Sequence, residues 1–220
     1  MSAEEFAALL AFATAMSFTP GPNTLMSTAL AANFGWRRAW RFIVAVPAGW
    51  TLMMLASALG LGALLTALPW LRATVQVLGV AYLAWLAWKL ARTRELPSRA
   101  DDRPTVGFWQ GVALQFVNVK AWMLALALAA GWVATSAGRS TPNPGERLAI
   151  VCGVMVVFAL SSNLLYAFAG SLLRRSLAHG TRLLWFNRAM ALLLVATAAW
   201  MLAAPAAAGG PAPVGTVEKP

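Results

Sequence analysis

An uncharged segment near the start of the chain contains the stretch Ser17-Phe18-Thr19-Pro20-Gly21-Pro22-Asn23. Each proline in it removes a backbone donor and disfavours helical angles at the residue that precedes it. A helix long enough to cross a membrane therefore cannot run unbroken through this stretch. The sequence predicts a membrane helix over residues 6–32 that is interrupted near its middle at Pro20, Gly21, Pro22 and Asn23.

The residues after this break could begin a second half-helix. Thr19 or Asn23 would then cap the half-helix, and Pro22 suits a first helical position. The free amides and the positive dipole end would face the middle of the membrane, where they could bind a substrate carboxylate. The alternative is a proline kink that only shapes helix packing.

The composition of the whole chain indicates a membrane protein. Of the 220 residues, 60% are hydrophobic and 11% are charged, against roughly 25% charged in soluble domains. A helical crossing needs about 20 mainly apolar residues. Six segments meet this requirement: 6–32, 42–65, 71–90, 108–133, 148–173 and 183–204. We expect an all-α integral membrane protein with six transmembrane helices.

The formal charge of +10 comes from basic residues that gather on one side of the predicted membrane. Those that follow the first, third and fifth spans are Arg37, Arg38, Arg41, Lys89, Arg92, Arg94, Arg99, Arg103, Arg174, Arg175, Arg182 and Arg188. The opposite side holds only Arg72, Arg139, Arg147 and Lys219. The positive-inside rule then places both termini in the periplasm of a bacterial inner-membrane protein. This placement also argues against nucleic-acid binding.

A polar segment, residues 93–107, divides the chain into halves of three spans each, residues 1–92 and 108–204. We expect this segment to be a cytoplasmic linker. Because each half has an odd number of crossings, related halves would be inserted in opposite orientations, as in many secondary transporters. Residues 205–220 are rich in proline and glycine, and we expect them to form a disordered tail without a function.

A second interruption is predicted at Asn118-Val119-Lys120, near the centre of the fourth span. Lys120 is the single charged residue deep inside any predicted span, and such a charge is costly unless it pairs or reaches water. It could bind a carboxylate, or release its proton and act in coupling. A structural lysine held by helix carbonyls is the alternative. Since helices 1 and 4 are both interrupted near mid-membrane, the two breaks predict one shared substrate site.

Further polar residues in the fifth span, Ser161, Ser162 and Tyr166, could line that site, although ordinary interhelical hydrogen bonds explain them equally well. All seven carboxylates lie outside the spans or at their ends, so the sequence offers no intramembrane acid for a proton relay. It also lacks a phosphate-binding glycine loop, a metal-ligand cluster and a nucleophile with a base. We therefore expect neither an enzyme nor an ATP-driven pump, and no cofactor or metal.

These motifs resemble the pattern of the LysE/RhtB-type amino-acid exporters over residues 1–204. The resemblance rests on residues 17–23, on residues 79–89, on Phe108-Trp109-Gln110-Gly111 and on residues 118–120, in that order. It implies export of amino acids from the bacterial cytoplasm, usually driven by the proton gradient, through a six-span fold of two inverted halves. Pro20, Gly21, Pro22, Asn23, Asn118 and Lys120 match the family's motif positions and inherit its suspected site.

Two departures from that family bear on mechanism. Val119 stands where the family usually has proline, which would soften the break in the fourth span. Trp50 and the pair Ser161 and Ser162 stand near positions where many members carry an acidic residue. Proton coupling through a carboxylate is therefore in doubt.

The sequence as a whole predicts a secondary transporter that exports amino acids or similar small zwitterionic metabolites. An uncoupled facilitator and a non-transport membrane scaffold are the alternatives. The expected partners are a small-molecule substrate and the lipid bilayer, and a homo-oligomer stays open. Because no intramembrane acid would pair with it, a basic substrate side chain is disfavoured.

Overall fold

The computed structural model describes residues 1–96, 104, 106–136, 139–141 and 143–203. These residues are helical apart from turns and a short antiparallel hairpin of β1 (Thr135–Ser136) and β2 (Arg139–Ser140). Most of the linker predicted at residues 93–107 lies outside the described residues, and so does the whole tail predicted at residues 205–220.

Helices fill both halves of the chain. Those before the linker are α1 (Ala3–Phe18), α2 (Pro22–Phe34), α3 (Trp36–Ala56), the π-helical turn η1 (Ser57–Leu61), α4 (Gly62–Ala67) and α5 (Pro69–Ala91). Those after it are α6 (Phe108–Val117), α7 (Val119–Leu128), the π-helical turn η2 (Ala129–Ala134), α8 (Pro144–Leu177) and α9 (Arg182–Ala203).

Four helical segments among the described residues are long and apolar enough to cross a membrane: Trp36–Ala67, Pro69–Ala91, Pro144–Leu177 and Arg182–Ala203. A fifth is added if α6 and the segment Val119–Ala134, which are bent by 68°, form one span. The predicted spans from residue 42 onward coincide with these five. The first predicted span is divided between α1, with 16 residues, and α2, with 13, and each is too short to cross alone. Length and composition therefore support four or five spans, against the six predicted.

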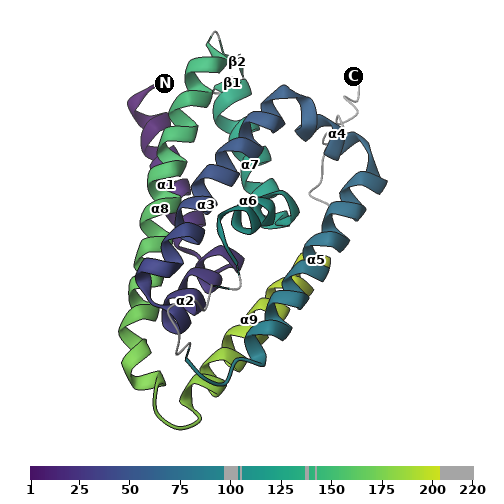
Figure 1. Ribbon diagram of the computed structural model, residues 1–220. Coiled ribbons are helices and arrows are strands. Elements are labelled where there is room, and N and C mark those ends of the chain that lie inside the picture. Colours follow the sequence, from purple (N-terminus) through teal and green to yellow (C-terminus); the bar gives the residue numbers. More distant parts are fainter. Residues whose placement is uncertain (97–103, 105, 137–138, 142, 204–220) are drawn as a thin grey trace, which may run out of the picture.

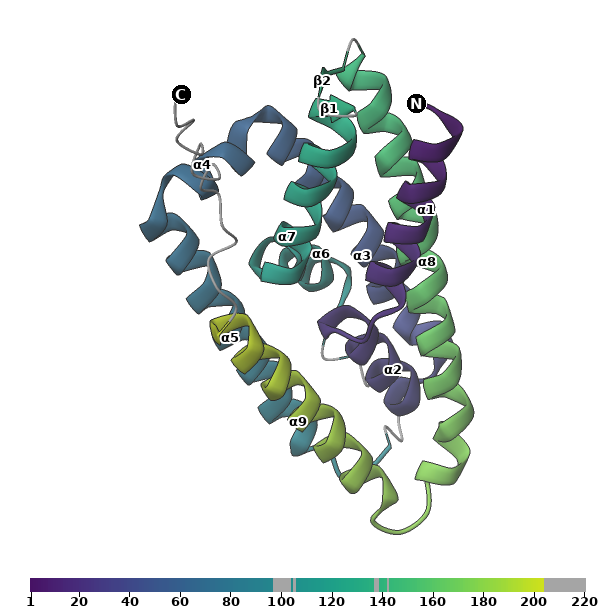
Figure 2. The ribbon, with the colours of Figure 1, turned by 180° about the vertical axis from the view of Figure 1, so that it is seen from behind.

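The long helix α8 runs beside α1, α2 and α3 on one side of the molecule (Figure 1). The antiparallel pair α5 and α9 forms the other side, and α6 and α7 lie between the two groups (Figure 2). The α5–α9 pair approaches α8 at the turn between α8 and α9 and diverges from it toward the other end. This arrangement brings the ends of α2, α6 and α7 into the centre of the molecule.

Polar contacts fix α1 and α2 to the second half. Arg147 at the start of α8 forms a 3.0 Å ion pair with Glu5 of α1, and Trp132 Nε1 donates to the Glu5 carbonyl at 3.1 Å. Toward the other end of the molecule, Asn33 of α2 and Asn187 of α9 exchange amide hydrogen bonds of 2.8 and 3.0 Å. Both ends of the interrupted segment are therefore held by residues distant in sequence.

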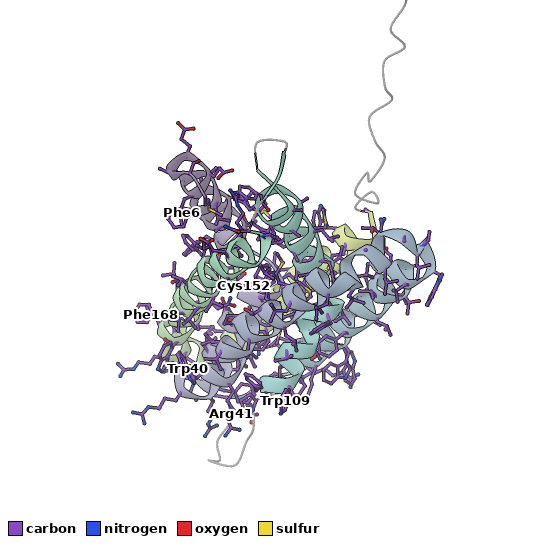
Figure 3. All side chains as sticks on the ribbon, turned by 90° about the horizontal axis from the view of Figure 1, so that it is seen from above. Phe6, Trp40, Arg41, Trp109, Cys152 and Phe168 are labelled. Carbon is purple, nitrogen blue, oxygen red and sulfur yellow. The ribbon has the colours of Figure 1, made fainter. Side chains whose placement is uncertain are left out.

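Large apolar side chains point outward from the helices, as expected of a surface in contact with lipid. Figure 3 shows Trp40, Trp109 and Phe168 on the outside of the bundle, and the Trp109 side chain is 76% exposed. The single cysteine, Cys152, lies on α8 and is partly buried.

Candidate functional site

The first break lies between the end of α1 at Phe18 and the start of α2 at Pro22, its first helical residue. Gly21 is the N-cap, and the Thr24 hydroxyl accepts from its amide at 3.0 Å and donates to its carbonyl at 3.1 Å. The expectation that Thr19 or Asn23 caps α2 is therefore wrong. Thr24 reaches back from the first turn to do so, whereas the Thr19 hydroxyl donates to the Ala15 carbonyl at the end of α1.

The second break lies at Asn118, whose backbone is extended with φ −88° and ψ 101°. Its side-chain oxygen accepts from the Lys120 amide at 3.1 Å, so Asn118 caps α7. Val119 occupies the first helical position, where proline is also favoured. The 68° bend between α6 and α7 thus forms without a proline.

The two breaks contact each other through side chains on both sides. Asn23 and Gln115 exchange two amide hydrogen bonds of 3.0 Å each, which join α2 to α6. The Lys120 ammonium donates to the Thr19 carbonyl at 3.2 Å, across the gap between α1 and α2. Residues about a hundred positions apart in sequence therefore meet at one place.

A cavity of about 60 Å³, lined by both polar and apolar side chains, lies beside this junction between α1, α2, α3, α7 and α8. Six of the predicted site residues line it: Gly21, Pro22, Asn23, Asn118, Lys120 and Ser162. Asn163 of α8 lines it too, and so do Ser17, Thr24 and Trp50, which were not predicted as site residues. Because a single ordered water needs at least about 10–15 Å³, this cavity has room for several waters or for the polar end of a small molecule.

Two buried polar atoms at this cavity, Trp50 Nε1 and Ser17 Oγ, have no hydrogen-bond partner among the described residues. The Trp50 side chain is 4% exposed. A buried donor without a partner is costly, and such groups are rare in folded proteins. Trp50 and Ser17 are therefore suited to a ligand that enters the cavity.

A second, larger cavity of about 350 Å³ lies on the other side of Lys120, between the first break and α9. Its lining from the break includes Thr19, Pro20, Gly21 and Lys120. Its lining from α9 is Leu193, Ala196, Thr197 and Trp200. Lys120, Thr19 and Gly21 thus border both cavities, and Pro20 borders only the larger one.

Two predicted site residues line neither cavity. The Tyr166 hydroxyl donates to the Phe18 carbonyl at 3.0 Å and so fixes the end of α1 to α8. Ser161 is exposed, and its hydroxyl donates to the Val157 carbonyl within α8 at 2.7 Å. Successive residues of a helix point about 100° apart, which separates Ser161 from its neighbour Ser162. No group of three or more His, Cys, Asp or Glu residues that could hold a metal occurs in the described part of the chain.

The family model and the named relatives that match this chain agree with each other. The family model described as "LysE type translocator" matches residues 14–204. The chain is 33% identical over 183 residues to a protein of Salmonella typhimurium named "Cysteine/O-acetylserine efflux protein", covering 81% of this chain and 88% of the relative. A protein of the same name from Escherichia coli O6:H1 is 33% identical over 187 residues, with the same coverage. No solved structure gives a significant match.

Proposed function

The chain belongs to the LysE type translocator family, and we propose that it exports amino acids from the cytoplasm across the bacterial inner membrane. The observation that carries this proposal is the position of Lys120, which lies where two helix breaks meet and borders the smaller cavity. The names of the relatives make cysteine and O-acetylserine the first substrates to test.

The transporter architecture we propose counts α1 with α2, and α6 with α7, as two broken spans. With α3–α4, α5, α8 and α9 they make six spans in two halves of opposite orientation. The hydrogen bonds that join the two breaks, Asn23 to Gln115 and Lys120 to Thr19, support this arrangement. Substrate sites of inverted-repeat transporters lie where such discontinuous helices meet.

The carboxylate of the substrate is the group that Lys120 binds. Among the described residues its ammonium has one hydrogen-bond partner, the neutral Thr19 carbonyl, and a carboxylate forms a stronger charge-assisted bond. Trp50, which lines the smaller cavity and whose Nε1 has no partner among the described residues, supplies a second donor. The first turn of α2 contributes its positive dipole end. Tyr166 acts indirectly, since it holds the end of α1 in place.

Replacement of this lysine tests the proposal. Cells that make the Lys120→Ala variant and are loaded with cysteine-containing dipeptides should lose at least about tenfold in efflux rate, because the lost bond is charge-assisted. Lys89→Ala is the matched control, since Lys89 lies over Trp85 near the end of α5 and borders neither cavity. Both variants must reach the membrane in wild-type amounts. Wild-type efflux from Lys120→Ala would refute the carboxylate role.

An uncoupled facilitator is the second candidate function. Among the described residues that line the two cavities, none is Asp, Glu or His, so no carboxylate or imidazole stands ready to carry a proton beside the substrate. Efflux that is unchanged when the proton gradient is collapsed at a fixed substrate gradient would favour the facilitator. Efflux that stops would favour coupling.

A further inference from the structure

We propose that the larger cavity between the first break and α9 receives the side chain of the exported amino acid, and that α9 selects substrates with neutral side chains of limited size. This inference rests on the proposed export function and adds to it the part of the molecule that determines specificity.

The sizes of the two cavities indicate where each end of the substrate lies. Lys120 borders both cavities, so a carboxylate bound to its ammonium lies at their junction. The cavity beside Trp50 holds about 60 Å³, whereas the cavity beside α9 holds about 350 Å³. Ligand pockets usually span roughly 300–1,000 Å³. The α9 side therefore has the larger space for an amino-acid side chain.

The wall of the larger cavity indicates which side chains fit. Leu25, Leu193, Ala196 and Trp200 make most of it apolar. Thr197 adds one hydroxyl, which already donates to the Leu193 carbonyl at 2.8 Å and so has acceptor capacity left. An aliphatic, thiol or small polar neutral side chain matches this wall. A cationic side chain would find no carboxylate among the described lining residues.

The lining residues of α9 occupy a single face of that helix. Leu193, Ala196, Thr197 and Trp200 follow the spacing i, i+3, i+4 and i+7, which aligns side chains along one stripe. Leu192 and Ala199 lie beside this stripe and do not line the cavity. This stripe of α9 therefore contains the residues that would select the substrate, and the positions beside it allow matched control substitutions.

Ala196→Leu, which fills the cavity, tests the inference against Ala199→Leu, the same change outside it. Cells that make each variant are loaded with dipeptides of alanine, cysteine, valine and leucine, and efflux of each free amino acid is measured. Ala196→Leu should lower leucine efflux relative to alanine efflux by about tenfold or more, the usual effect of one or two methylenes in a pocket. Ala199→Leu should keep the wild-type ratio.

Leu193→Ala, which enlarges the cavity, should change the ratio in the opposite direction and raise efflux of leucine relative to alanine. Equal changes for all four amino acids in Ala196→Leu and Leu193→Ala, or the same ratio in Ala196→Leu and Ala199→Leu, would overturn the inference while leaving the export function intact. No efflux of any amino acid from wild type would instead refute the proposed function itself.

Discussion

At the scale of single residues, Trp50 has the most direct chemical consequence. Its ring fills a buried position beside the smaller cavity, and its Nε1 has no hydrogen-bond partner among the described residues. Trp50→Phe removes the donor and keeps most of the ring. We expect the substrate concentration for half-maximal efflux to rise about tenfold, the loss of one hydrogen bond to a charged group, with the protein amount unchanged.

Trp109→Phe is the control for that measurement, because Trp109 lies on the outer surface and borders neither cavity (Figure 3). Half-maximal efflux at the wild-type concentration in both variants would show that the indole N–H does not contact the substrate.

The sequence predicts a candidate site residue where the residue type is out of place in lipid. Lys120 is such a case, since a lone charge in an apolar span has few explanations. Trp50 carries no such signal, because tryptophan is common in membrane helices and its polar atom is useful only in a specific orientation. The sequence also could not separate Ser161 from Ser162, because only the rotation of α8 decides which one faces the cavity.

At the scale of helices, the contact between α2 and α8 depends on Gly170. A Cβ at this position would overlap the Thr28 carbonyl of α2. Gly170→Ala must therefore push α2 away from α8, and overpacking of this kind costs about 1–3 kcal/mol. We expect a lower midpoint of thermal unfolding for the purified protein in detergent.

Gly153→Ala provides the comparison on the same helix, since nothing lies within 4 Å of a Cβ there. An alanine helix position is intrinsically more stable than a glycine one. Its unfolding midpoint should equal or exceed that of wild type. Equal midpoints for Gly170→Ala and Gly153→Ala would contradict the close packing of α2 on α8.

The length of the apolar segments predicted the boundaries of the helices more accurately than the sequence predicted the details of the helix breaks. The segments predicted at residues 71–90 and 183–204 agree with α5 and α9 to within two residues at each end. The capping of α2 was wrong in detail, because a threonine inside the first turn can replace an N-cap side chain. The sharp bend at Asn118 shows that a capping asparagine can end a helix without proline.

At the scale of the whole molecule, the prediction to test is orientation. Ser2 precedes α1, His179 lies in the turn between α8 and α9, and both are exposed. The N-terminus and that turn lie toward opposite ends of the bundle (Figure 1). In a Cys152→Ser background, Ser2→Cys should react with a membrane-impermeant maleimide on intact cells whose outer membrane is permeable. His179→Cys should react only after the inner membrane is opened. The reverse pattern would place both termini in the cytoplasm.

The relation between the two halves of the molecule stays a prediction. Sequence similarity between the halves is too weak to establish it, and apolar length alone counts four or five spans. Helices α1 and α2 are each too short to be counted as a crossing, because the break between them divides one apolar segment into two helices. Interrupted spans are therefore the elements that a length criterion identifies least well.

The buried bond from the Ser27 hydroxyl to Asn163, at 2.7 Å, joins positions 136 residues apart and has a consequence for biosynthesis. Ribosomes add roughly 5–20 residues per second, so α2 waits on the order of ten seconds for its polar partner to be synthesised. During that interval the nascent α2 is in the bilayer with Ser27 and Asn33 unmatched by α8 and α9. During this interval the newly inserted N-terminal half is most exposed to the insertion machinery and to membrane proteases. Slower translation would prolong that exposure.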